Sequence, residues 1–237
     1  MIPLDTPLRI GSLVFEGLDQ VDLTAPLQVL AQLPNSTYRL YGKTTDTVRD
    51  HKGLRLTPDV AIADAPQLDV LHVPGGAGQE ALMHDEEILA WLRRQAAGAK
   101  SVLSVCTGAL ILGAAGLLIG KRATTHWASF HLLEEFGAIP VDERVVVDGK
   151  WVFAAGVTAG LDAAIRLAAE LRGDEVAQSI TLLMEYSPEP PFKTGTPETA
   201  PSHILEKVRQ AVRPLTTRRE HTARRAAVRL GVKAPSS

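Results

Sequence analysis

The chain has 237 residues, a formal net charge of −2 and a single cysteine. An apolar fraction of 45% with so little net charge excludes an intrinsically disordered chain. One cysteine excludes both an internal disulfide framework and a metal site built on several thiolates. This cysteine is therefore either a small buried hydrophobic residue or the one reactive thiol of the protein.

The charge is divided unevenly along the chain. Residues 204–237 carry nine Lys and Arg against two Glu, a net +7, which leaves −9 on residues 1–203. Such a basic tail could bind nucleic acid, or it could form a solvated helix packed against an acidic body or a partner subunit. The tail has no interleaved aromatic residues and no recognisable DNA-binding module. We therefore favour packing and expect no nucleic-acid partner.

No export or membrane signal is expected from the sequence. The first residues lack a basic segment followed by a long apolar stretch. The longest apolar run, residues 108–120, is shorter than the roughly 20 residues that a membrane-spanning helix needs. We expect a cytoplasmic protein that does not contact a membrane.

The first part of the chain alternates strands and helices. Short runs of apolar residues predict buried strands, and segments with helical spacing and capping residues predict helices. In chain order we predict a strand at 8–15, a helix at 24–33, a strand at 37–41, short strands within 46–57, a strand ending at 73, a helix at 85–97, a strand at 101–105, a helix at 107–118, a strand at 123–126 and a helix to 136.

The second part begins with a hairpin signal, Asp148-Gly149, between short strands at 145–147 and 151–153. Helices follow at 158–171 and 174–186, then a Pro-rich connector and helices at 202–212 and 216–230. The alternation predicts an α/β fold with a mostly parallel sheet and helices on both faces. We expect residues 1–200 to form this domain, and residues 201–237 to be a helical extension packed on the domain or on a partner subunit.

The strongest local signal is Cys106, which stands between the strand at 101–105 and the helix at 107–118. A sharp strand-to-helix turn lifts its side chain into the crevice at the strand ends, where ligands bind in open α/β sheets. Gly108 removes a Cβ where the helix must approach the sheet closely. The helix N-terminus favours a thiolate and predicts a lowered pKa for Cys106. We therefore predict a nucleophile rather than a structural cysteine.

Asp22 follows the first predicted strand and therefore reaches the same crevice. It lies between the apolar residues Val21 and Leu23, so we expect a carboxyl group that is turned inward. Burial and a nearby thiolate would both raise the pKa of Asp22. Such a carboxyl can serve as a general acid and base near neutral pH. Asp19 fits a helix-terminal or surface charge better than Asp22 does.

Pro74-Gly75-Gly76 follows the strand ending at 73 and predicts a turn. Glycine-rich turns of this kind can direct backbone N–H groups at an anionic atom or at one that becomes anionic during a reaction. The glycine spacing of a dinucleotide-binding fingerprint is absent. The turn is therefore a candidate for binding a substrate group rather than a nucleotide cofactor.

No histidine partner for Cys106 is evident, because Thr107 follows it directly. His126, at the end of a later predicted strand, could line the crevice together with Trp127. His72 lies inside a buried strand and fits a satisfied core histidine. No two histidines stand at metal-ligand spacing on one helix, so we expect no metal site.

These segments resemble a known family. Residues 105–109, with 74–76 upstream and 123–127 downstream, resemble the DJ-1/PfpI superfamily, whose fold is a flavodoxin-like sandwich related to class I glutamine amidotransferases. Members of that superfamily carry a cysteine at the nucleophile elbow. Residues 20–26, 157–162 and 185–192 resemble its isocyanide hydratase branch in particular.

The resemblance implies a homodimeric enzyme that adds water to a small isocyanide, R–NC, and gives an N-substituted formamide without a metal or cofactor. In this interpretation Cys106 matches the nucleophile, which forms a thioimidate, and Asp22 matches the general acid and base. The expected substrate-binding residues are Gly75, Gly76, Thr107, His126, Trp127 and Val157.

Two other interpretations stay open. Some transcription regulators have a similar N-terminal domain, but they need a helix-turn-helix region of about a hundred residues, and only about 50 residues follow Tyr186. The chain could instead be a DJ-1-like redox or stress protein, since an exposed thiolate can be oxidised. Superfamily members with hydrolase or glyoxalase-like activity typically have His directly after the cysteine, where this chain has Thr107.

Overall fold

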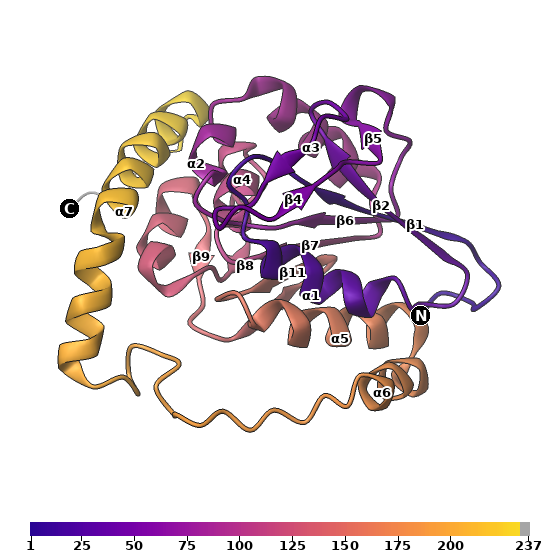
Figure 1. The fold of residues 1–237 in the computed structure, drawn as a ribbon. Coiled ribbons are helices and arrows are strands. Elements are labelled where there is room, and N and C mark those ends of the chain that lie inside the picture. The colour runs from indigo at the N-terminus through magenta and orange to yellow at the C-terminus, as the bar shows by residue number, and fades with distance from the viewer. Residues whose placement is uncertain (233–237) are drawn as a thin grey trace.

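The computed structural model describes residues 1–232, and its centre is one seven-stranded sheet (Figure 1). In spatial order the strands are β10 (Val145–Asp148), β11 (Trp151–Ala154), β7 (Ser101–Val105), β6 (Val70–Val73), β1 (Leu8–Leu13), β2 (Ser36–Gly42) and β5 (Val60–Ala61). Every neighbouring pair is parallel except the hairpin of β10 and β11. The predicted flavodoxin-like α/β architecture is confirmed.

Helices cover both faces of the sheet (Figure 1). One face carries α1 (Gln20–Leu30), α5 (Ala159–Arg172) and α6 (Asp174–Leu183), and the other carries α2 (Gln79–Leu82), α3 (Glu86–Gly98), α4 (Gly108–Ala114) and the 3-10 helix η2 (Trp127–Phe136). Side chains alternate across each strand, so β1 places Leu8 and Ile10 in one apolar core and Leu13 in the other. Smaller elements are β3 (Val48–Arg49), β4 (Arg55–Leu56), η1 (Ile62–Asp64), β8 (Arg122–Ala123) and β9 (Ile139–Pro140).

Helix α1 begins at Gln20, four residues before its predicted start. Asp19 is its N-cap, and the Asp19 side chain accepts a hydrogen bond from the backbone N–H of Val21 at 2.9 Å. Pro26, which we expected near the helix start, lies inside the helix instead. The earlier start places Asp22 within the first turn of α1.

Two further predictions about elements are wrong. The strand predicted at 123–126 is only the two residues of β8, because His126 is instead the N-cap of η2 and accepts from the N–H of Ala128 at 3.3 Å. The two predicted terminal helices are one helix, α7 (Ser202–Leu230), which continues through Pro214. Pro214 removes one backbone hydrogen bond, but the residues around it are exposed, so water reaches the freed carbonyl group.

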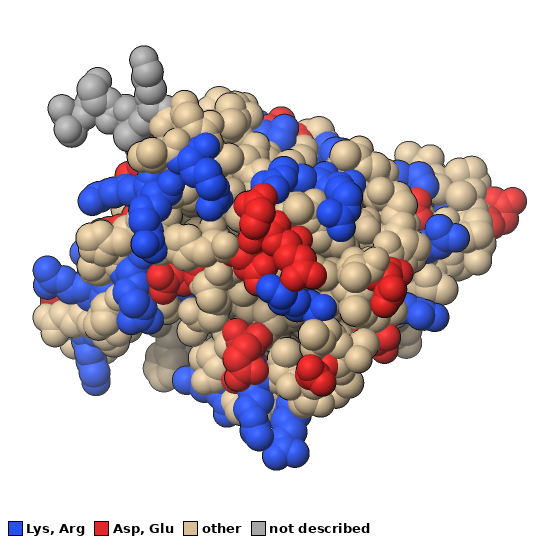
Figure 2. Space-filling view, turned by 90° about the horizontal axis from the view of Figure 1, so that it is seen from above, with Lys and Arg blue, Asp and Glu red and all other residues tan. Residues whose placement is uncertain are grey.

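Helix α7 packs against η2, α4 and α2, and an extended segment across the molecule connects it to α6 (Figure 1). Lys and Arg side chains gather on the side of the molecule where α7 lies (Figure 2). Residues 233–237 of the expected extension lie outside the described residues.

The close approach of α4 to β6 gives the first testable prediction. A Cβ added to Gly108 would lie 2.1 Å from the carbonyl oxygen of Val73, which is backbone and cannot move aside cheaply. We expect Gly108→Ala to lower the free energy of unfolding by about 2 kcal/mol, measured by urea denaturation. Gly195→Ala is the matched control, because a Cβ there meets open space. Equal unfolding free energies for the two variants would contradict this account of the α4 packing.

Candidate active site

Three chain segments that leave the sheet at the same edge form the candidate active site. Strands β1, β6 and β7 are neighbours and parallel, so their carboxyl ends lie side by side. Asp22 follows β1, Gly75 follows β6 and Cys106 follows β7. In the strand order, β2 is added next to β1 toward one edge of the sheet, whereas β6 and β7 are added toward the opposite edge. Such a reversal of strand order is the usual ligand position in an open α/β sheet.

Cys106 forms the predicted elbow between β7 and α4. Its φ of 54° lies in the left-handed region, an unfavourable conformation for a residue with a side chain. Two hydrogen bonds to the backbone of Cys106 hold it there. Its N–H donates to the carbonyl of Ala154 at 3.1 Å, and the side-chain hydroxyl of Thr125 donates to its carbonyl at 2.6 Å. The Cys106 side chain is buried in this position. Sequence reasoning missed this role of Thr125, although it had singled out the segment 123–127.

The turn after β6 is joined to the start of α1. The N–H of Asp19 donates to the carbonyl of Gly75 at 2.9 Å, and a Cβ on Gly76, whose φ is 133°, would lie 2.3 Å from that same nitrogen of Asp19. Only glycine fits this approach. The Gly75–Gly76 turn therefore holds the start of helix α1 in place. Within this contact the N–H of Gly75 donates to Oδ2 of Asp22 at 2.9 Å.

The Asp22 carboxyl is fully buried. Among the residues that the structure describes, no group hydrogen-bonds its second oxygen, Oδ1, by distance and angle. Burial, together with the charge of Asp19, raises the pKa of Asp22 to about 7, although the Gly75 N–H, the Cys106 thiol and Arg219 act in the opposite direction. This agrees with the expectation of an inward-turned carboxyl that exchanges a proton near neutral pH.

The predicted lowering of the Cys106 pKa is wrong. Burial raises the pKa of the thiol well above its ordinary value, and the charge of Asp22 raises it further. The N–H of Thr107 and the charge of Arg219 act in the opposite direction but are smaller in effect. Helix α4 is only seven residues long, so its dipole does not outweigh the removal of the thiolate from water. The thiol therefore needs a base before it can attack.

The N–H groups of the Gly75–Gly76 turn are engaged within the protein. That of Gly75 donates to Asp22, and that of Gly76 donates to the hydroxyl oxygen of Thr107 at 3.2 Å. The carboxyl group that this turn binds is therefore that of Asp22, the candidate catalytic residue, rather than a group of the substrate. Thr107 is 1% exposed, and its hydroxyl fixes the start of α4 against the turn.

The remaining predicted site residues, His126, Trp127 and Val157, line one cavity of about 590 Å³. Thr125, which also lines it, bonds the Cys106 carbonyl and so connects the cavity wall to the elbow. Burial and the charge of Arg219 lower the pKa of His126 to about 4, so its ring is neutral near pH 7. The structure thus places the predicted residues in two groups, one around the Cys106–Asp22 pair and one on the wall of this cavity.

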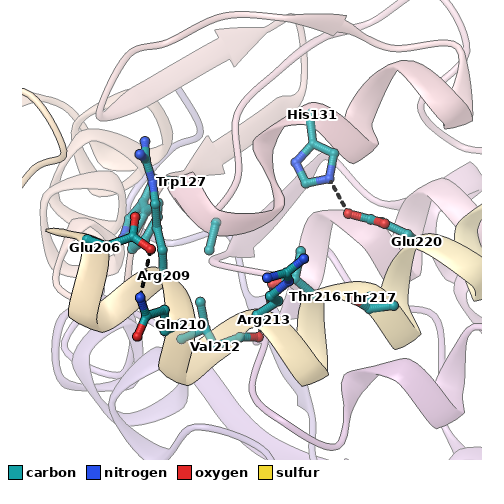
Figure 3. Close-up of a pocket in the computed structure, with 11 residues that line it drawn as sticks. Trp127, His131, Glu206, Arg209, Gln210, Val212, Arg213, Thr216, Thr217 and Glu220 are labelled. Carbon is teal, nitrogen blue, oxygen red and sulfur yellow. Dashed lines mark hydrogen bonds and ion pairs between the residues drawn. The ribbon is translucent and has the colours of Figure 1, made fainter.

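Trp127 also lines a second cavity, of about 570 Å³, between η2 and α7 (Figure 3). His131 and Glu220 are hydrogen-bonded across it, with 3.1 Å between Nε2 and Oε1. Neither Cys106 nor Asp22 lines this cavity or the first one. The first cavity is the better candidate for the organic part of a substrate, because Thr125 on its wall hydrogen-bonds the Cys106 carbonyl.

Sequence reasoning also missed a charged neighbour of the site, Arg219 on α7. Arg219 is 6% exposed, and its guanidinium donates to the carbonyl of Gly76 at 2.8 Å. A signal was present: Arg219, Thr222, Ala223 and Ala226 follow helical spacing and share the buried face of α7. Small residues on that stripe indicate a helix that packs closely, and they place Arg219 on the packed side.

Within residues 1–232 no group of three or more His, Cys, Asp or Glu side chains is placed to hold a metal ion. No helix in the same range is both long and apolar enough to cross a bilayer.

Comparisons with known proteins agree with this geometry. The model of the DJ-1/PfpI family matches residues 9–170. The chain is 49% identical to the isonitrile hydratase of Pseudomonas putida, covering 95% of this chain and 99% of that protein. A ThiJ/PfpI family protein from Pseudomonas syringae has a crystal structure that matches with a TM-score of 0.91 and 39% identity, covering 94% of this chain and 93% of that one. The HTH-type transcriptional regulator GbdR of Pseudomonas aeruginosa is 29% identical over 76% of this chain and 51% of that protein. The chain belongs to the DJ-1/PfpI family.

Proposed function

We propose that this protein is an isocyanide hydratase, a hydro-lyase that adds water to R–NC and releases the formamide R–NH–CHO. The observation that carries the proposal is the 49% identity to an isonitrile hydratase along nearly the full length of both chains. The site supplies the two groups that the reaction needs, a nucleophile and a proton carrier, within one buried pair.

In the first step, Asp22 takes the proton of the Cys106 thiol while sulfur attacks the terminal carbon of the isocyanide. Burial raises the pKa of Asp22, so its carboxylate is a stronger base than an exposed one and can take the thiol proton as sulfur attacks. Asp22 then delivers that proton to the same carbon. The product is a thioimidate, in which carbon is bonded to Sγ, to hydrogen and to the substrate nitrogen.

In the second step, Asp22 removes a proton from a water molecule that attacks the thioimidate carbon. Asp22 passes that proton to the substrate nitrogen, the carbon–sulfur bond breaks, and its electron pair returns to Sγ. The remaining hydroxyl proton then moves through Asp22 to Sγ as the carbonyl of the formamide forms. The formamide leaves and Cys106 is restored. One nucleophile and one carboxyl are enough for this sequence, because each proton that Asp22 accepts is passed on.

The other site residues have supporting roles in the proposal. Gly75, Gly76 and Thr107 hold the reacting groups in place, since their hydrogen bonds fix Asp22 and the elbow relative to each other. His126, Trp127 and Val157 contact the R group, since they line the cavity whose wall includes Thr125, the hydrogen-bond partner of the Cys106 carbonyl.

The experiment that tests the function is a turnover assay with one alkyl and one aryl isocyanide. We expect the purified protein to form the matching N-substituted formamide, followed by NMR, at a rate well above that in buffer. A heat-unfolded sample at the same concentration is the control. Formamide formation no faster than in that control, from a protein with native circular dichroism, would contradict the proposal.

The similarity to GbdR makes a ligand-sensing regulator the second candidate. That protein carries about as much chain again beyond the part matched here. A gel shift at physiological salt separates the candidates, because specific nanomolar DNA binding would reject the enzyme and support the regulator. A redox-sensing role is disfavoured by the buried thiol, whose raised pKa leaves little of the reactive thiolate.

We further propose a cytoplasmic homodimer, with residues 1–200 as the domain and 201–237 as its extension. The support for a dimer is the exposure of large apolar side chains at the end of α6 and in the segment after it: Leu182, Leu183 and Phe192 are 82%, 77% and 77% exposed. Sedimentation equilibrium at micromolar concentration should give twice the chain mass, and Leu183→Glu should weaken the association. A monomer for the unaltered chain would contradict the assembly.

A further inference from the structure

Helix α7 brings a buried cation to the edge of the active site. The three hydrogen bonds of Arg219 tie together three separate elements: Nε donates to Oε1 of Gln79 on α2 at 2.8 Å, Nη1 to the hydroxyl of Ser129 on η2 at 3.4 Å, and Nη2 to the carbonyl of Gly76 at 2.8 Å. All three partners are neutral groups. A buried guanidinium held only by neutral partners still needs negative charge nearby to offset its removal from water.

Negative charge faces Arg219 from the reacting pair and from Glu80 on α2. Cys106, Glu80 and Asp22 each favour the charged form of Arg219, whereas burial and Arg218 lower its pKa. In return, Arg219 lowers the pKa of both Cys106 and Asp22. An arginine keeps its proton even when buried. The cation is therefore present whenever the Cys106–Asp22 pair becomes negative.

Arg219 also fixes the turn on which Asp22 depends. The Gly76 carbonyl accepts from Arg219 at 2.8 Å and from the Thr107 hydroxyl at 3.5 Å, and the N–H groups of Gly75 and Gly76 donate to Asp22 and Thr107. The turn thus connects α7 to the reacting groups, and loss of the Arg219 hydrogen bond leaves the Gly76 carbonyl only its longer contact with Thr107.

We propose that Arg219 is a positioning residue of the active site: its charge stabilises negative charge on the Cys106–Asp22 pair, and its hydrogen bond to Gly76 holds the turn that orients Asp22. The C-terminal helix α7 thereby completes the site, and its basic composition includes one arginine with a role inside the protein. Only the activity part of this inference rests on the proposed function.

Two variants separate the charge from the hydrogen bonds. Arg219→Gln keeps a hydrogen-bonding side chain and removes the charge, and Arg219→Lys keeps the charge and removes the forked donor. Arg224→Gln is the matched control on the same helix, because the side chain of Arg224 is 63% exposed and pairs with Glu135 at 3.7 Å. Each variant is measured in two ways: kcat with an isocyanide, and the rate of Cys106 alkylation by iodoacetamide between pH 6 and 10, followed by intact mass. The chain has one cysteine, so every adduct reports Cys106.

We expect Arg219→Gln to shift the alkylation profile to higher pH and to slow alkylation at pH 7.5 by about tenfold, the change that one unit of thiol pKa produces. Arg219→Lys should keep the profile of the unaltered protein and lower kcat, and Arg224→Gln should change neither. An unshifted profile in Arg219→Gln would overturn the electrostatic role. Unchanged kcat in Arg219→Lys would overturn the positioning role.

Folding and the proposed function are controlled separately. If Arg219→Gln fails to fold, Arg219→Lys decides: a lowered kcat with the unaltered alkylation profile supports the inference, and unchanged kcat overturns it. Alkylation needs no isocyanide. A protein that does not hydrate isocyanides but shows the shift in Arg219→Gln would reject the proposed function and retain the electrostatic role of Arg219.

Discussion

Replacing Cys106 with alanine is expected to reduce kcat/KM for isocyanide hydration by about three orders of magnitude or more, the loss typical of a removed nucleophile. Cys106→Ser should lose nearly as much, although serine has almost the same shape, because a hydroxyl is a far weaker acid than a thiol and Asp22 cannot deprotonate it near pH 7. The serine variant therefore separates the chemistry of sulfur from the filling of space. Activity is measured as formamide release, and folding by circular dichroism and thermal unfolding.

The matched control for Cys106 is Ser101→Ala, a similarly small change at the other end of β7. It should leave kcat/KM unchanged. Ordinary turnover in Cys106→Ala would refute the thioimidate mechanism. Ordinary turnover in Cys106→Ser would show that the residue positions water rather than forming a bond to carbon.

The elbow and its pairing with Asp22 could be predicted because both follow from local signals and topology. A strand, one residue and a helix rich in small residues indicate the turn at Cys106, and parallel neighbouring strands place their ends together. The pKa of Cys106 could not be predicted in the same way. It depends on how completely the residues around the crevice exclude water, which is a property of the packed structure and not of the helix that follows the thiol.

Contacts across long stretches of sequence were also beyond prediction. Arg219 bonds Gly76 across 143 residues, and the stripe of small residues beside it indicates only which face of the helix packs, not which partner that face meets. Pro214 suggested a break between two helices, whereas the exposed position of that turn allows one continuous helix. Because α7 is continuous, its second half carries Arg219 and the buried Ala223 and Ala226 on one face, which packs onto the domain.

Asp22→Asn is expected to lose activity and gain stability at neutral pH. Asparagine can still accept the hydrogen bond from Gly75, but it cannot carry a proton between Cys106, the isocyanide carbon and water. We expect kcat to fall by about two to four orders of magnitude, the usual size of a lost general acid–base group. The stability gain arises because the unaltered protein must either ionise or keep protonated a carboxyl with almost no access to water.

The sign of the pH dependence follows from the raised pKa of Asp22, which moves from 3.8 to about 7 on folding. Below pH 4 the carboxyl is protonated in both the folded and the unfolded chain, so its contribution to stability is fully present. Between pH 4 and 7 the unfolded chain releases the proton and the folded protein retains it, so the folded state loses stability as pH rises. Above pH 7 both forms are ionised and the loss is constant. One pKa unit corresponds to about 1.4 kcal/mol, so the full loss is up to about 4 kcal/mol.

Asp22→Asn has no such titration, so its melting temperature relative to the unaltered protein should rise from pH 4 to pH 7 and then level off. Asp5→Asn, an exposed carboxyl before the opposite end of β1, should give a curve parallel to that of the unaltered protein. A pH-independent difference between Asp22→Asn and the unaltered protein would mean that Asp22 keeps an ordinary pKa. In that case it could not return to the protonated form near pH 7 during turnover, and the shared-proton mechanism would require another acid. A difference that grows through this pH range, together with the loss of turnover, would show that the protein maintains a destabilising carboxyl because the reaction needs its proton.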